Sequence, residues 1–233
     1  MKSTRSQLEH RGFCDDNRAE ALADKSRVEL IHLLSDNDPV TRTAAARCLK
    51  HHKSDDAIQA LCETLVREDR LYTRLEICET LVSFGKDSVP RLSSLLGKIG
   101  DNRLESAPGT IFRKKSYPLP RDLAARTISR IGKDALPALA DILDHGDFTA
   151  AREAIDAIGF ICFAEADDRM LSHLTDFARR NTDDDVVRWK IAIALRAFRT
   201  PDAASFADEF FADETNRIIR EEAVVSVSGK PVN

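Results

Sequence analysis

The stretch between residues 100 and 118 carries the densest group of side chains suited to binding. Phe112, Arg113, Lys114, Lys115 and Tyr117 follow closely on one another between prolines. Guanidinium and ammonium groups donate charge-assisted hydrogen bonds to carboxylates and phosphates, and neighbouring aromatic rings add apolar contact. The stretch therefore predicts a loop that binds an acidic peptide or a phosphate group. A tolerated, mobile loop without a ligand is the alternative.

Three further candidate binding residues lie on predicted helices. Trp189 is the only tryptophan, Lys190 follows it directly, and Arg126 belongs to another helix. Cations beside an aromatic ring can hold an anionic ligand. The same set of helices also carries acids, namely Glu76, Glu79, Glu153 and Asp156. Mixed signs of this kind are equally typical of an ordinary solvated face.

The sequence offers no set of residues with a catalytic or metal-binding pattern. None of the six histidines is followed by Glu, and the run Asp183 to Asp185 lacks the alternating ligands and glycine of a calcium loop. There is no nucleophile elbow and no phosphate-binding P-loop. We therefore assign no catalytic residue, no metal and no cofactor, and expect a protein that is not an enzyme.

Composition narrows the class of partner and the compartment. The net charge is −4 and the pI about 5.9, which argues against nucleic acid as a partner. Five cysteines without a CxxC pair indicate reduced thiols, and Cys48, Cys62 and Cys78 fall on apolar helix faces. No apolar run reaches the roughly 20 residues of a membrane span. We expect a cytoplasmic protein.

Helical periodicity predicts that the candidate residues are positioned by successive helical hairpins. The chain is 42% hydrophobic but only 6% aromatic, as expected for helices packed through Ala, Leu and Ile. The outer helices are predicted at about 25–34, 58–66, 89–96, 135–143, 170–177 and 206–211. The inner helices are predicted at about 40–51, 71–85, 121–131, 150–158, 187–198 and 220–227, with Gly85, Gly132 and Gly159 as stops.

A recurring arginine marks the inner helices. The interval is 32 residues both from Arg42 to Arg74 and from Arg188 to Arg220. Asp38 before Pro39 is a helix N-cap, and we predict a structural ladder in which each Arg bonds an Asp of its own or the neighbouring repeat. A row that binds an anionic partner is the alternative. The ladder comprises Arg42, Arg74, Arg121, Arg188 and Arg220, with Phe148 at the matching position of the fourth unit.

The repeated pattern resembles HEAT repeats. The stretch from Asp38 to Leu49, together with Ala135-Leu-Pro-Ala-Leu before Ile142-Leu143, is similar to the short bacterial HEAT-like type that also occurs in phycobilin lyases. The resemblance covers residues 25–228 and implies an all-α fold: an α-solenoid of five to six HEAT-like hairpins in a curved right-handed superhelix. Because such repeats serve scaffolds and enzymes alike, the resemblance does not specify an activity.

From these patterns we predict three regions: an N-terminal tail and capping helix (1–24), the repeat array (25–228) and a short tail (229–233). The insertion at 100–118 is expected to project from one edge of the array. The function predicted is a non-enzymatic protein-binding or scaffold module that presents a concave inner-helix surface to a protein or peptide. A bilin-lyase-like or tetrapyrrole-binding protein is the first alternative, and a nucleic-acid-binding HEAT-like protein is the second, less favoured one.

Overall fold

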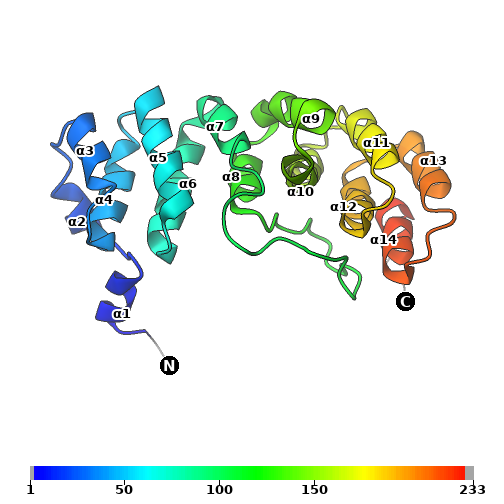
Figure 1. Cartoon of the computed structure of the whole chain (residues 1–233), viewed down its shortest axis with the longest axis horizontal. Coiled ribbons are helices and arrows are strands. Elements are labelled where there is room, and N and C mark those ends of the chain that lie inside the picture. The colour runs from blue at the N-terminus through cyan, green and yellow to red at the C-terminus, as the bar shows by residue number, and fades with distance from the viewer. Residues whose placement is uncertain (1–2, 229–233) are drawn as a thin grey trace. The chain divides into compact units, whose positions relative to one another are not determined.

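The computed structural model describes residues 3–228, and within that range every regular element is a helix (Figure 1). The chain divides into two compact units, Met1–Leu92 and Ser93–Asn233. Among the described residues, no helix is both long and apolar enough to cross a membrane.

The first unit contains two helical hairpins preceded by two short helices. Each outer helix packs on the inner helix that follows it, and the two inner helices, α4 and α6, pack side by side. The elements are α1 (Arg5–His10), α2 (Asp16–Glu20), α3 (Arg27–Leu33), α4 (Pro39–Leu49), α5 (Asp55–Arg67), α6 (Leu71–Ser83), the 3₁₀ helix η1 (Gly85–Ser88) and α7 (Val89–Ser93), which continues to the unit boundary.

The second unit has an inner layer of four helices and an outer layer of three. In the inner layer, α10 packs against both α8 and α12, and α12 packs against α14; the outer helices α9, α11 and α13 follow the same order. The elements are α8 (Leu123–Ile131), η2 (Lys133–Ala135), α9 (Leu136–His145), α10 (Phe148–Glu165), α11 (Leu171–Arg180), α12 (Asp185–Ala194), η3 (Leu195–Ala197), α13 (Pro201–Phe210) and α14 (Arg217–Ser228).

The N-terminal region is more regular than a polar tail. Helix α1 begins with a capping box in which Thr4 accepts from the Gln7 backbone and the Gln7 side chain returns a bond to Thr4. Tyr72 of α6 donates its backbone N–H to the Arg11 carbonyl, and Phe13 packs edge-on against the Tyr72 ring. These contacts hold residues 5–13 against the rest of the first unit, where the sequence predicted a tail before a capping helix.

Five of the six inner helices in the described chain begin on an acidic or amide N-cap, whereas α6 follows Arg70 without a side-chain cap. Asp38, Asp122, Asp147 and Asp184 each accept a backbone N–H from the first turn of the helix that follows, and Asn216 does the same for α14. A carboxylate at this position satisfies donors that the helix itself cannot pair and faces the positive end of its dipole. Local sequence thus sets where each of these inner helices starts.

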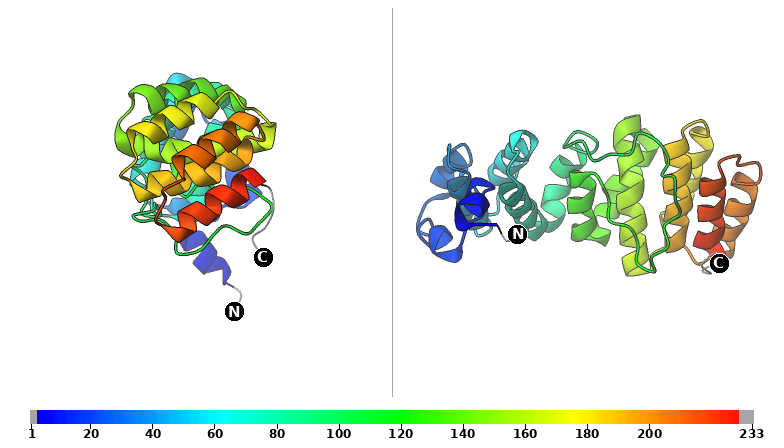
Figure 2. Two further views of the ribbon diagram at one scale, coloured as in Figure 1. Left: turned by 90° about the vertical axis from the view of Figure 1, so that its right-hand side faces the viewer. Right: turned by 90° about the horizontal axis from the view of Figure 1, so that it is seen from below.

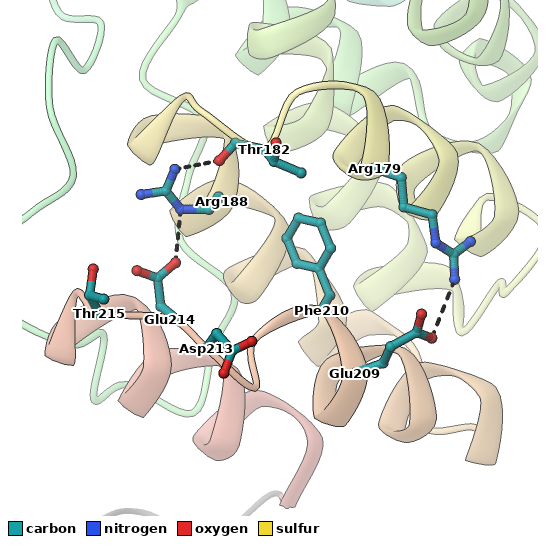
Figure 3. Close-up of a pocket in the computed structure, with 8 residues that line it drawn as sticks. All are labelled: Arg179, Thr182, Arg188, Glu209, Phe210, Asp213, Glu214 and Thr215. Carbon is teal, nitrogen blue, oxygen red and sulfur yellow. Dashed lines mark hydrogen bonds and ion pairs between the residues drawn. The ribbon is translucent and has the colours of Figure 1, made fainter.

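A buried charge pair links successive hairpins at two places in the chain. Arg42 donates from Nε to Oε2 of Glu68 at 2.7 Å and from Nη2 to Oε1 at 2.9 Å. Arg188 donates from Nε to Oε2 of Glu214 at 2.8 Å, as Figure 3 shows. Each partner lies 26 residues further along, just before the next inner helix. The predicted structural role of Arg42 and Arg188 therefore rests on Glu, not on the Asp that the sequence suggested.

Each of these glutamates also orders its own turn. Glu68 accepts the backbone N–H groups of Asp69 and Arg70, and Glu214 accepts that of Asn216. Each arginine also binds the turn before its own helix: Arg42 donates to the Asp36 carbonyl and Arg188 to the Thr182 carbonyl, both six residues earlier. One charge pair thereby holds two turns together.

The ladder is incomplete in the middle of the chain, and two of its predicted positions are wrong. Counting from the N-cap, the third-unit equivalent is Arg126, which donates to the Pro120 carbonyl six residues earlier, whereas Arg121 is exposed and precedes the helix. The fourth-unit equivalent is Ala151, not Phe148. Arg74 Nε is buried without a hydrogen-bond partner among the described residues, and Arg220 bonds only the Glu214 carbonyl there. The insertion misled the alignment of the third and fourth units.

Replacing Arg42 by Ala is expected to destabilise the protein by about 2–4 kcal/mol, because the Glu68 carboxylate would stay buried without its partner. The Glu68 side chain is only 2% exposed. Urea unfolding measures the change. Arg27→Ala is the control: Arg27 pairs with Asp56 on the surface, where both side chains are about half exposed, and its loss should cost under about 1 kcal/mol. Equal effects of the two substitutions would contradict the structural role.

The same pair should make stability depend on pH. Burial opposes ionisation of Glu68, but hydrogen bonds from Arg42 and two backbone N–H groups outweigh it and lower the Glu68 pKa. Below the ordinary Glu value of about 4.3, the unfolded chain takes up a proton that the folded chain resists, so stability falls as pH falls. Glu68→Gln should flatten this loss in urea unfolding between about pH 5 and pH 3; an unchanged slope would show that other groups control it.

Candidate functional site

The insertion lies across the inner helices of the second unit and does not project from an edge as predicted. The right-hand view of Figure 2 shows this green segment crossing the helices that follow it. We call residues 104–117 the strap. Arg152 of α10 donates to the Leu104 carbonyl at 3.1 Å, and Asp185 of α12 accepts the Ala107 N–H at 3.0 Å. Side chains from two helices thus hold its first half.

Tyr117 anchors the other end of the strap. Its ring is 6% exposed and packs against Phe160 and Phe163 of α10. The ring can approach this closely because residue 159 is glycine: a Cβ there would overlap the Tyr117 hydroxyl. Burial, followed by the nearby Asp156 charge, raises the Tyr117 pKa well above its ordinary value, so the phenol is neutral. Tyr117 is therefore an anchor of the loop and not an open ligand contact.

The role of Gly159 differs from the sequence prediction. Glycine was expected to end the fourth inner helix, but α10 runs through position 159 to Glu165. A helix interior tolerates glycine at a cost of about 1 kcal/mol relative to alanine. Packing of the Tyr117 ring against the bare Gly159 backbone offsets this cost.

Arg196 joins the strap to α14. Its guanidinium pairs with Glu222, which is fully buried, and Nη2 also donates to the Phe112 carbonyl at 2.6 Å. The Phe112 N–H donates to the second oxygen of Glu222 at 2.7 Å, and the Phe112 ring packs under the guanidinium at 5.3 Å. Phe112 is consequently held through its backbone and its ring by one ion pair.

A basic pocket of about 870 Å³ opens where the strap meets α14 and the start of α13. Five cations line it, and they come from two parts of the chain. They are Arg113, Lys114 and Lys115 from the strap, Arg196 of η3, and Arg199 just before α13. Phe112, Phe163 and Phe198 supply aromatic surface, and none of the described residues that line the pocket is acidic.

The charge of this pocket is available to a ligand. Arg113, Lys114, Lys115 and Arg199 have exposed side chains, and within residues 3–228 none of the four forms an ion pair. Arg196 alone is neutralised, by Glu222. Uncompensated cations beside apolar walls attract an anionic group and bind it more strongly than in open water. The arrangement can bind an anion that carries an apolar part.

Two predicted binding residues are buried in the core. Trp189 is 8% exposed and Lys190 1% exposed. Lys190 Nζ donates to Glu153 at 2.8 Å and to the Arg152 carbonyl at 2.9 Å, and it pairs with Asp156 at 3.1 Å. This buried cluster ties α12 to α10. The predicted ligand contacts at these two positions are therefore wrong.

The sequence reasoning brought together only part of the pocket. Phe112, Arg113, Lys114 and Lys115 lie on it as predicted candidates, whereas Arg126 bonds the Pro120 carbonyl. Arg196 and Arg199 were missed, because cations near a helix end have an ordinary explanation in the helix dipole. They lie far from the strap in the sequence, and no local pattern predicts that they contact it.

The cysteines are structural. All five are buried and none forms a disulfide, and burial raises the pKa of Cys62 and Cys162 to about 12. Such thiols remain protonated and are poor nucleophiles. In the described part of the chain, no group of three or more His, Cys, Asp or Glu side chains is placed to hold a metal ion.

Comparison with known proteins identifies the repeat. Residues 27–107 match the family model described as HEAT repeats. One similar solved structure is the crystal structure of an engineered protein from the Northeast Structural Genomics Consortium, at 18% identity and a TM-score of 0.38. The alignment covers 94% of this chain and 61% of that one. No curated protein matches the chain.

Residues 27–107 therefore carry HEAT repeats, and the described residues form an all-helical fold of stacked hairpins, in agreement with the predicted α-solenoid. HEAT repeats are common in protein-interaction scaffolds. The predicted division into tail, array and terminal segment, and the predicted superhelical hand, stay predictions.

Gly159→Ala should destabilise the protein by about 1–3 kcal/mol, because the added methyl overlaps Tyr117 in a packed site. In a Tyr117→Ala background the overlap is gone and Ala is the better helix former, so the cost should fall below about 1 kcal/mol. Thermal or urea unfolding of the four proteins in this double-mutant cycle checks the coupling. Additive effects would mean that Tyr117 does not pack against residue 159. Gly109→Ala, in open space, should be neutral.

Proposed function

We propose that this protein is a non-enzymatic protein-binding module that captures an acidic segment of a partner protein in the basic pocket. One observation carries the proposal: five cations and no described acid surround a cavity in a chain whose net charge is −4. Charges of one sign gathered in a cleft repel each other, and a ligand of opposite charge relieves that repulsion.

The shape and chemistry of the pocket favour a peptide with both acidic and apolar side chains. Arg113 and Arg199 can grip a carboxylate through two parallel N–H donors, and Lys114 and Lys115 add point charges. Phe163 and Phe198 line the same cavity and offer apolar contact. A volume of about 870 Å³ matches that of ordinary ligand pockets, so a few residues of an acidic segment can be held.

The repeat architecture supports a binding role of this kind. Stacked hairpins present one long surface, and an insertion in one repeat adds a specific feature to it. Here the strap adds three of the five cations, so the insertion distinguishes this surface from a plain helical face. The alternative of a bilin-lyase-like protein needed Trp189 in an open pocket, and that residue is buried.

The proposal predicts that a labelled peptide of alternating Glu and Leu binds the protein, measured by fluorescence anisotropy. The triple variant Arg113→Glu, Lys114→Glu, Lys115→Glu should weaken binding at least tenfold, because three attractive contacts become repulsive. Binding by the unmodified protein should also weaken as NaCl is raised from 50 to 500 mM.

The control carries the same change of charge elsewhere. Lys86→Glu, Lys98→Glu, Lys133→Glu lies outside the pocket and should bind within about threefold of the unmodified protein. If both triple variants lose affinity equally, binding is a general charge effect. If neither loses affinity, the basic pocket is not the site, and the proposal fails.

A further inference from the structure

The inner helices of the second unit bind the strap through its main chain. Arg152 donates to the Leu104 carbonyl, Asp185 accepts the Ala107 N–H, and Glu222 accepts the Phe112 N–H. Arg196 donates to the carbonyls of Phe112 and Lys114 at 2.6 and 3.3 Å. All five hydrogen bonds end on backbone groups of the strap, and α10, α12, η3 and α14 each supply at least one of the donors or acceptors.

The strap makes no backbone hydrogen bonds of its own. Between residues 99 and 120 no backbone-to-backbone bond is formed within the described chain. The strap has no regular secondary structure, and its polar groups are satisfied by side chains of a folded surface or by solvent. A peptide bound in a groove is held in the same way, through hydrogen bonds from the receptor to its main chain. A packed loop, by contrast, commonly pairs some of its own backbone groups in turns.

The two aromatic side chains of the strap occupy two sockets on the helices. One seats Tyr117 on Gly159 beside Phe160 and Phe163, and the other holds Phe112 beneath Arg196. The side chains between them, from Arg113 to Ser116, point away and are exposed. Because backbone groups are common to all peptides, we infer that the two aromatic residues contribute most to what the surface accepts.

We propose that this inner-helix surface is a binding groove for an extended peptide, in which residues 104–117 are the resident occupant. The ligand that exchanges with them is an extended partner segment with two aromatic residues in the spacing of Phe112 and Tyr117. Tethering gives the resident strap a high effective concentration, so a partner succeeds only when it binds better or when the strap is weakened. The groove meets the basic pocket at Phe112, Phe163 and Arg196, but it recognises the main chain and the aromatic rings of its occupant, whereas the proposed function rests on the exposed cations.

The test adds a fluorescent synthetic peptide of residues 102–119 to the full-length protein and follows anisotropy. The unmodified protein should bind it weakly, because its own strap competes. Full-length Phe112→Ala, Tyr117→Ala keeps the groove and weakens the resident strap, and it should bind the peptide at least tenfold more tightly. Adding Arg196→Ala to that variant should remove the gain, since two of the five main-chain bonds are lost.

A peptide of the same charge with both aromatics replaced by Ala is the control and should bind at least tenfold more weakly. Equal binding of the two peptides would mean charge attraction alone and would overturn the proposal. So would unchanged affinity in a Phe112→Ala, Tyr117→Ala variant that is folded by circular dichroism. This outcome leaves the Glu-Leu peptide assay of the basic pocket unaffected, so the two proposals fail separately.

A second measurement, on the unmodified protein, tests the proposal even if the double variant does not fold. In the unmodified protein, a saturating amount of the peptide should displace the strap and raise hydrogen–deuterium exchange at residues 104–117 by at least threefold. The Ala-substituted peptide should leave exchange unchanged. If neither peptide alters exchange at the strap, residues 104–117 are a fixed part of the fold and the groove is not exchangeable.

Discussion

The charge pair between an inner-helix arginine and the glutamate before the next inner helix sets how successive hairpins stack. In the pairs Arg42–Glu68 and Arg188–Glu214, the glutamate is nearly buried and also accepts backbone N–H groups of its own turn. A buried carboxylate without these donors would be costly. The same carboxylate therefore stabilises both the stacking of two successive hairpins and the turn within the second of them.

In the middle of the second unit, where this pair is absent, a different set of buried charges joins the helices. Lys190 of α12 bonds Glu153 and the Arg152 carbonyl of α10. Asp122 caps α8 and also accepts the Gly97 N–H, with burial raising its pKa. Lys190 and Glu153, which lie on inner helices, are thereby buried in the core. The strap then covers the surface that remains.

The strap gives the second unit both of its distinctive surfaces because its side chains divide between the interior and solvent. Phe112 and Tyr117 face the helices, whereas Arg113, Lys114 and Lys115 face outward. The inward residues and the main chain occupy the proposed groove, and the outward cations form one wall of the basic pocket. Arg196 belongs to both, since it holds Phe112 and lines the cavity. Movement of the strap would therefore change the pocket as well.

The sequence by itself determined the helices and the repeat, because N-caps such as Asp38 and apolar periodicity act within a few residues. It also identified the basic and aromatic residues of the insertion. The tertiary structure alone decided where that insertion lies: Tyr117 meets Gly159, and Arg196 meets Phe112, across long stretches of chain. The burial of Trp189 and Lys190 was decided in the same way. Non-local packing chooses which face of a helix is covered, and no local pattern encodes that choice.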